Sequence, residues 1–346
     1  MKKKLYILMD LQLFATQTTG TNSSGNSLTA EMKTFYDDTL LDEAQPLLVH
    51  HQFGQKRPIP KGRGKVIEFR KFSSLAKATT PLTEGVTPSG NTLNVTAITA
   101  TVLQYGDFVE LSDLLELTAV DPIITETTKL CGNQAGLTMD TVVRNVLQAG
   151  TNVMYAPKYV TASGVTTKTA VTSRANLDAT AILDVDLIKK AAAFLKAQNA
   201  KTIGGSYVGI IHPYAAYDLM SDPAWIDVHK YAAPDEIFNG EIGKIGGVRF
   251  VETSEAKIVT QAISSVNYGV FCTLILGADA YGVTDVSGEG LQTIIKQKGS
   301  AGTSDPLDQR STVGWKALEV AEILNNAYMV RLESMSPTWS SGLAAN

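Results

Sequence analysis

The pattern of apolar and polar positions changes several times along the chain and predicts a mixture of helices and strands. Continuous apolar runs at 207–211 and 270–276 are typical of buried strands. Alternating runs at 66–72 and 98–105 predict two strands that pair with each other as a long hairpin. The predicted fold class is therefore α+β.

The segment between these two strands is long and rich in turn-forming residues. It runs from 73 to 96 and carries Pro81, Gly85, Pro88 and Gly90. A connection of about 20 residues without regular structure does not suit a compact domain unless it contacts something else. We therefore expect residues 64–111 to form a projecting hairpin that is ordered mainly by a neighbouring molecule.

A long helix is predicted behind Asp121-Pro122, because aspartate favours the N-cap and proline the first turn. The pattern continues to Ala149, and Gly150 ends it, which gives about 42 Å at 1.5 Å per residue. Gly132 and Gly136 inside it predict the close approach of a neighbouring element. The expected apolar stripe consists of Ile124, Cys131, Ala135, Thr138, Val142 and Val146.

Further helices are expected at 30–44, from 184 or 186 to 198, and at 212–220, where His212 precedes Pro213. Ser163-Gly164 predicts a hairpin, and 240–251 a turn followed by a strand. Asn325-Asn326 predicts a turn that joins 314–324 and 327–332 into an antiparallel hairpin. Residues 15–30 are polar and are expected to be a flexible arm.

Composition favours a protein whose surface is covered by copies of itself. Only 18% of the 346 residues are charged, the formal net charge is −4, and 37 residues are threonine, which favours strands. Two cysteines cannot form a disulfide framework, and the apolar run near the start is too short for a secretion signal, so a cytosolic chain is expected. The sequence has no run of about 18 apolar residues, so no membrane partner is expected.

Positive charge is concentrated between residues 51 and 80. This segment holds eight cations and one acid, Glu68, whereas the remainder holds 22 cations and 33 acids. Such a segment attracts acidic surfaces, either on a neighbouring copy or on nucleic acid by non-specific phosphate contact. A solvated charged face is the third interpretation. The candidates for contact between subunits are Lys65, Arg70, Lys71, Lys77 and Glu84.

Signals for catalysis are weak. The histidines His50, His51, His212 and His229 lack metal-ligand spacing, so no metal or cofactor is expected. We expect a structural or solvent role for His50 and His51, and His212 is placed to cap a helix. Ser74 and Ser254 each precede a lysine by three residues, the spacing of some serine acyl-transfer enzymes, but the supporting motifs are missing. The glycines at 240–247 fit turns better than a phosphate-binding loop.

The order of these elements resembles the major capsid proteins of tailed bacteriophages. The resemblance rests on 9–15, the hairpin, the helix behind Asp121-Pro122, His212-Pro-Tyr-Ala-Ala-Tyr-Asp-Leu219, the segments 240–252 and 277–282, and Asp305-Pro-Leu with Gly314-Trp-Lys. It implies a non-enzymatic protein that forms pentamers and hexamers of an icosahedral shell around double-stranded DNA. The implied location is the virion, after assembly in the cytoplasm of a host bacterium.

The resemblance also implies an organisation and further partners. The expected parts are an N-terminal arm and first helix (1–62), an extended loop (63–115), a peripheral domain with the long helix (116–232), an axial domain (233–312) and a C-terminal hairpin returning to the peripheral domain (313–346). Scaffold, portal and decoration proteins are implied partners besides copies of the chain. The alternatives left open are a bacterial nanocompartment shell that encloses protein cargo, and a serine acyl-transfer enzyme.

Overall fold

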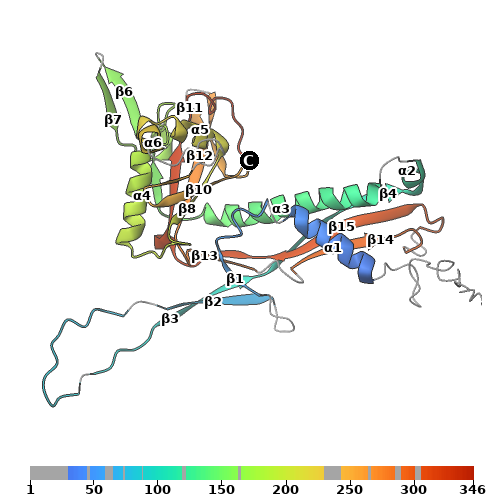
Figure 1. Ribbon diagram of the computed structural model, residues 1–346, viewed down its shortest axis with the longest axis horizontal. Helices are drawn as coiled ribbons and strands as arrows, with labels where there is room; N and C mark the ends of the chain where they lie inside the picture. Colours follow the sequence, from blue (N-terminus) through green and yellow to red (C-terminus); the bar gives the residue numbers. More distant parts are fainter. Residues whose placement is uncertain are drawn as a thin grey trace, which may run out of the picture. The chain divides into compact units, whose positions relative to one another are not determined.

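The computed structural model describes residues 30–44, 47–58, 65–72, 75–87, 89–118, 122–162, 165–229, 243–263, 266–284, 290–300 and 305–346. The chain forms two compact units (Figure 1). Unit 1 consists of Met1–Gln45, Tyr105–Ala135 and Leu291–Ala317, and unit 2 of Pro46–Gln104, Gly136–Gly290 and Leu318–Asn346. The expected flexible arm at 15–30 lies outside the described residues, except for its last residue.

Unit 1 is built on a three-stranded sheet in the order β14-β15-β4, with β14 and β15 antiparallel. Its elements are α1 (Ala30–Ala44), β4 (Leu103–Ser112), α2 (Asp113–Thr118), the first half of α3 (Ile123–Leu147), β14 (Leu291–Lys296) and β15 (Arg310–Glu319). Gln134 on α3 joins two strands, because it donates to Asp107 (2.7 Å) and accepts from the indole of Trp315 (3.0 Å).

Helix α1 lies close to α3 where α3 has no side chain. A β-carbon on Gly132 would lie 2.8 Å from the carbonyl oxygen of Leu40, so only glycine permits this approach. The expectation that Gly132 marks a close neighbour is confirmed. The helix at 30–44 is also confirmed.

Unit 2 contains a seven-stranded mixed sheet in the order β5-β17-β12-β8-β10-β9, with β11 paired to β12. Its strands are β5 (Val153–Tyr155), β8 (Tyr207–Ile211), β9 (Lys244–Ile245), β10 (Val248–Glu252), β11 (Ile258–Ile263), β12 (Val266–Leu276) and β17 (Met329–Ser334). Gly246 and Gly247, both with positive φ, form the turn between β9 and β10. The apolar runs at 207–211 and 270–276 are thus central strands, as the sequence predicts.

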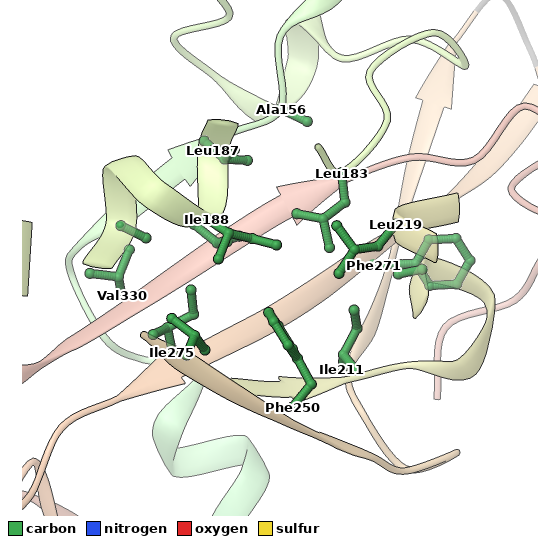
Figure 2. Close-up of a cluster of buried hydrophobic side chains, with 14 of the residues drawn as sticks. Ala156, Leu183, Leu187, Ile188, Ile211, Leu219, Phe250, Phe271, Ile275 and Val330 are labelled. Carbon is green, nitrogen blue, oxygen red and sulfur yellow. The ribbon is translucent and has the colours of Figure 1, made fainter. Parts of the chain in front are cut away.

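Helices cover the sheet of unit 2. Helix α4 (Val185–Ala197) and α5 (Pro213–Met220) pack over one large apolar cluster with Leu183, Phe250 and Phe271 (Figure 2). Val143 and Leu147, in the second half of α3, belong to a different cluster with Val208, Leu274 and Tyr281. The remaining helical segments are η3 (Arg174–Asn176), α6 (Pro223–His229) and η5 (Asn326–Tyr328).

Three smaller sheets complete unit 2. They are β1-β13-β16, the pair β2-β3 and the pair β6-β7. Their strands are β1 (Gln55–Arg57), β2 (Val66–Phe72), β3 (Val95–Thr101), β6 (Lys158–Ala162), β7 (Val165–Thr169), β13 (Tyr281–Thr284) and β16 (Ala321–Ile323). The hairpin predicted around Ser163-Gly164 is confirmed by the antiparallel pairing of β6 and β7.

The long helix is confirmed at Ile123–Leu147, but its predicted stripe is only partly right. Cys131 and Ala135 are buried, whereas Thr138, Val142 and Val146 are half-buried. The buried apolar stripe continues through Met139, Val143 and Leu147. Positions three and four residues apart lie almost equally well on one helix face, so periodicity alone did not choose between these two sets.

Two further expectations are wrong. The C-terminal hairpin does not form, because β15 pairs with β14 while β17 pairs with β12 and β5 in another sheet. Asn325 instead caps the short helix η5 by accepting from the amide of Ala327. The hairpin expected over 64–111 is limited to β2 and β3, since β4 joins the sheet of unit 1. The five-part domain division stays a prediction.

Candidate assembly surface

The hairpin of β2 and β3 is anchored through one apolar face. Strands β2 and β3 pair in antiparallel register from Val66↔Thr101 to Phe72↔Val95. Ile67, Phe69, Ala100 and Val102 are buried, and Leu318, Val320 and Leu324 pack against them. The alternation of the sequence therefore places one side of the hairpin on the rest of unit 2 and leaves the other in solvent.

The loop beyond the strands is a different surface. All described residues from 75 to 94 are exposed. They include four large apolar side chains, Leu75, Leu82, Val86 and Leu93, with exposed fractions of 59, 78, 62 and 63%. The charges of this region are predicted from the sequence, whereas its exposed apolar character is not. We call residues 75–94 the loop segment.

The five contact candidates fall in two places. Lys65, Arg70 and Lys71 lie at the hairpin strands, and Lys77 and Glu84 lie in the loop segment. Lys71 is half-buried and the other four are exposed. Arg70 already has a partner, since its Nε donates to Glu68 at 2.9 Å along the same strand.

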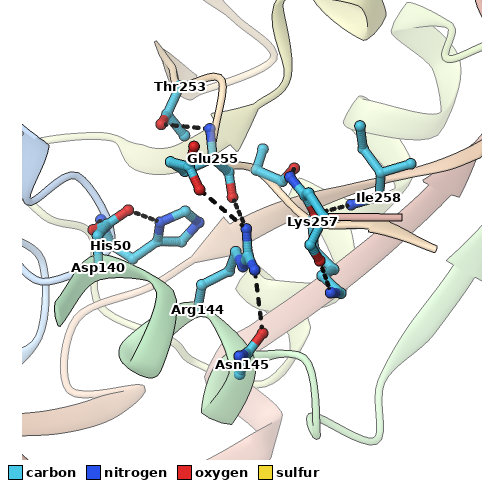
Figure 3. Close-up of polar contacts among 10 residues, drawn as sticks. His50, Asp140, Arg144, Asn145, Thr253, Glu255, Lys257 and Ile258 are labelled. Carbon is cyan, nitrogen blue, oxygen red and sulfur yellow. Dashed lines mark hydrogen bonds and ion pairs between the residues drawn. The ribbon is translucent and has the colours of Figure 1, made fainter. Parts of the chain in front are cut away.

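A buried polar cluster in unit 2 includes His50 and Asp140 (Figure 3). The ring of His50 donates to Asp140 on α3 at 2.7 Å, and the backbone amide of His50 donates to the same carboxylate at 2.6 Å. The hydroxyl of Tyr281 donates to the carbonyl oxygen of His50. His51 Nε2 lies 2.8 Å from the carbonyl oxygen of Thr284. Both histidines thus form hydrogen bonds inside the fold.

Arg144, one turn after Asp140, is also buried. Its guanidinium donates to the backbone oxygen of Glu255 at 2.7 Å and lies 3.5 Å from the carboxylate of the same residue (Figure 3). Burial lowers the pKa of Arg144, and the charges of Glu255 and Asp140 oppose that shift. Sequence reasoning missed this cluster, because the partners of Asp140 and Arg144 are about 90 and 110 residues away in the chain.

Around Ser254, the described residues do not form the geometry expected of a serine acyl-transfer site. Ser254 is exposed in a turn and not on a helix, and the ammonium of Lys257 contacts Asn346. Ser74 lies outside the described residues. His212 caps α5, since its Nδ1 accepts from the amide of Tyr214 at 3.2 Å. Within the described ranges, no group of three or more His, Cys, Asp or Glu side chains is arranged to hold a metal.

A pocket of about 400 Å³ in unit 2 is lined by Tyr159, Tyr217 and the carboxylates of Asp184, Asp218 and Asp222. Two of these carboxylates make structural contacts. Asp184 caps α4 and binds Lys168 at 2.7 Å, and Asp222 accepts from two backbone amides. Burial raises the pKa of Asp218, and a hydrogen bond to Ser336 opposes this shift. Among the described helices, none is long and apolar enough to span a membrane.

Comparison with known proteins identifies the family. A family model described as phage capsid protein matches residues 111–298, more than half of the chain. The chain belongs to the phage capsid protein family. The resemblance to tailed-phage major capsid proteins is therefore confirmed, and this capsid protein has a structural role. A search of curated proteins gives no match.

Solved capsid structures share the fold of this capsid protein. The capsid of cyanophage P-SCSP1u gives a TM-score of 0.60 at 15% identity, over 84% of this chain and 88% of that chain. The capsid of Ralstonia phage GP4 gives 0.61 at 16% identity, over 82% and 87%. The capsid of cyanophage Pam1 gives 0.58 at 12% identity, over 92% and 97%.

Proposed function

We propose that this capsid protein assembles into pentamers and hexamers of an icosahedral shell that encloses double-stranded DNA, and that it carries out no catalysis. The observation that supports this proposal best is the loop segment, an exposed apolar surface held on an anchored hairpin. Its place of action is the virion, after assembly in the cytoplasm of the host bacterium. Scaffold, portal and decoration proteins are further partners in the proposal.

The loop segment needs a partner for physical reasons. Ordering a residue costs about 1–2 kcal/mol, and side chains that are about 60–80% exposed gain little from burial in their own subunit. Each of the four apolar side chains would contribute about 1.5–3 kcal/mol if fully buried on a neighbour. A second copy offers such a surface at every position of a shell, so we assign the loop segment to contact between subunits.

Charge would direct this contact. The segment 51–80 carries eight cations and one acid, whereas the rest of the chain carries 22 cations and 33 acids. Opposite charges on two copies steer association and suppress wrong orientations. We assign Lys65, Arg70 and Lys71 to the base of the contact and Lys77 and Glu84 to its loop. Because Glu68 already holds Arg70, the exchange of that bond for an acid of the neighbour would fix the register.

The experiment combines assembly with hydrogen exchange. The full chain, expressed alone and with scaffold candidates, is examined by sedimentation and electron microscopy. We expect shells, and we expect the amides of the loop segment to exchange rapidly in subunits and slowly in shells. Reversal of both Arg70 and Lys71 to Glu should block assembly without changing subunit melting. Stable monomers under every condition, or equally slow exchange in monomer and shell, would contradict the proposal.

The nanocompartment alternative is separated by particle size and content. Shells that package a genome need many copies and hexamers, so they are larger than shells built for protein cargo. Particles from infected cells should therefore contain double-stranded DNA and display hexamers beside pentamers. Small particles that contain only protein would favour the nanocompartment.

A further inference from the structure

Two consecutive histidines in unit 2 each lie against a buried carboxyl group. His50 Nδ1 lies 2.7 Å from Asp140 Oδ2, and His51 Nε2 lies 3.6 Å from Glu319 Oε2. The side chains of all four are at most 4% exposed. All four side chains are therefore shielded from bulk solvent.

The two pairs differ in how well the carboxyl group is satisfied. Both oxygens of Asp140 accept hydrogen bonds from His50. Oε1 of Glu319 accepts from the hydroxyl of Thr284 at 2.8 Å, while its Oε2 accepts no hydrogen bond from the described residues. Because a carbonyl oxygen only accepts, His51 Nε2 must donate its proton to Thr284 (2.8 Å), and this bond already occupies the proton nearest to Glu319. Glu319 is therefore the group with an uncompensated charge when ionised.

Glu319 lies in the strand segment that carries the hairpin. Its neighbours Leu318 and Val320 pack against the apolar face of β2 and β3. The ring of Phe69, on that face, contacts Gly282, which lies two residues before Thr284 on β13. A movement of Glu319 or Thr284 would therefore be transmitted to both elements that contact the hairpin, the segment 318–320 and β13.

We propose that the buried His51–Glu319 pair is a proton-controlled switch that holds the β2–β3 hairpin against β13 and the segment 318–320 while Glu319 is protonated and releases it when Glu319 loses its proton. On deprotonation the proton leaves to solvent and a full negative charge remains among apolar side chains. The imidazole then turns toward the carboxylate, and its bond to Thr284 breaks. Both β13 and the segment 318–320 shift, and the anchor of the hairpin loosens.

Glu319 titrates in a pH range that solution experiments can reach. Burial raises the pKa of Glu319 from the ordinary 4.5 to about 8, and hydrogen bonds from the hydroxyl and amide of Thr284 and from the amide of Val320 only partly oppose this shift. Among the described residues of the neighbouring elements, none but His51 brings a cationic nitrogen within 4 Å of the Glu319 carboxylate. The charged residues there are Lys56 and half-buried Arg57 on β1, Glu68, Arg70 and Lys71 on β2, Glu322 on β16, and Asp140 and Arg144 on α3. Asp140 and Arg144 are already committed to His50 and Glu255.

The sign of the pH effect follows from this shift. The folded state holds more protons than the unfolded state between about pH 4.5 and 8, so stability falls as the pH rises through that range. The ratio of folded to unfolded protein should fall about 10²- to 10³-fold. The same loss should appear as weaker protection of the hairpin amides at 66–72 and 95–101.

The test measures hydrogen exchange of unassembled full-length subunits at pH 6 and pH 9, corrected for the intrinsic exchange rate. In the wild type, protection of the hairpin amides should fall at least tenfold at pH 9. Glu319→Gln, which keeps the shape of the protonated group, should keep its protection at both values. Glu322→Gln, on the nearby strand β16, should behave as the wild type. Protection that does not change in the wild type, or that falls equally in Glu319→Gln, would overturn the switch.

A second variant keeps the proposal testable if Glu319→Gln fails to fold. Thr284→Val removes the hydroxyl that donates to the carboxylate, so the midpoint of the transition should move to higher pH. An unchanged midpoint would contradict the proposal.

The consequence for shells rests on the proposed function and is measured separately. Particles should form at pH 6 and fail at pH 9 in the wild type, whereas Glu319→Gln should assemble at both. Shells that form equally at both values, with hairpin exchange independent of pH, would sink the switch and leave the proposed function intact. A pH-dependent hairpin without shells under any condition would support the switch and contradict the proposed function.

Discussion

The ring of Phe69 lies directly against the α-carbon of Gly282. A β-carbon on Gly282 would lie 2.6 Å from Cδ1 of that ring, closer than real contacts allow. Phe69 is fully buried, so the ring cannot move outward without exposing apolar surface. The contact fixes the hairpin to β13 and makes glycine necessary at this position.

We expect Gly282→Ala to destabilise the subunit by about 1–3 kcal/mol, because the added methyl group overfills a packed site. Urea denaturation measures the loss, and hydrogen exchange should locate it in β2 and β3. Gly90→Ala is the matched control, since a β-carbon there meets no atom within 4 Å and should change stability by less than about 0.5 kcal/mol. Equal effects of the two variants would show that the Phe69 contact does not constrain the hairpin.

The buried face of α3 gives a second pair of variants. Ala135 is fully buried, whereas the side chain of Lys129 is 40% exposed and bonds Glu126 at 3.0 Å. Ala135→Leu should therefore cost about 1–3 kcal/mol, and Lys129→Ala less than about 0.5 kcal/mol. Chemical denaturation of both variants tests the assignment. A larger loss in Lys129→Ala would mean that the faces are assigned wrongly.

The cap of α5 should be sensitive to acid. Burial lowers the pKa of His212 below the ordinary 6.5, and its Nδ1 must be unprotonated to accept from Tyr214. The unfolded chain therefore binds more protons in this range, so stability is present above pH 6.5 and is lost as the pH falls through the lowered pKa. Urea denaturation at pH 5 and 7 should show this loss in the wild type. In His212→Asn, which retains a capping oxygen, the loss should be smaller, and an unchanged loss would assign it to other groups.

Two arginines in different surroundings should respond differently to removal of their charge. The side chain of Arg144 is 3% exposed beside Glu255, whereas that of Arg70 is 64% exposed beside Glu68. Arg144→Met should cost about 3 kcal/mol, since it leaves a partly buried carboxylate without its partner. Arg70→Met should cost at most about 1 kcal/mol. Urea denaturation compares them, and equal losses would contradict the structural role of Arg144.

Local signals in the sequence predicted local structure well. His212-Pro213 marks the start of α5, and the apolar run at 207–211 is β8, because caps and buried strands depend on residues close in the chain. Pairing across long distances was harder to foresee. The runs on either side of Asn325 looked like partners, yet each pairs with a strand in a different sheet.

The sequence predicted where the candidate assembly surface lies, but it did not predict that this surface exposes large apolar side chains. The long connection after Phe72 indicated a surface that needs a neighbour. The apolar side chains of Leu82 and Val86 were overlooked, because exposure is a property of the folded chain. No local pattern links Asp140 to a partner, and only the fold brings His50 to it.

The position of β17 determines when, during synthesis of the chain, the sheet of unit 2 can be completed. This strand lies between β5 and β12, and it pairs with Val153–Tyr155 on one side and with residues 271–276 on the other. The sheet of unit 2 therefore lacks the strand between β5 and β12 until the ribosome has made and released residues up to Ser334. A nascent or truncated chain would leave β12 without its neighbour and expose its backbone groups as a sheet edge. Only subunits translated through β17 can close this sheet, so a subunit without Met329–Ser334 would carry an unpaired edge at the centre of unit 2.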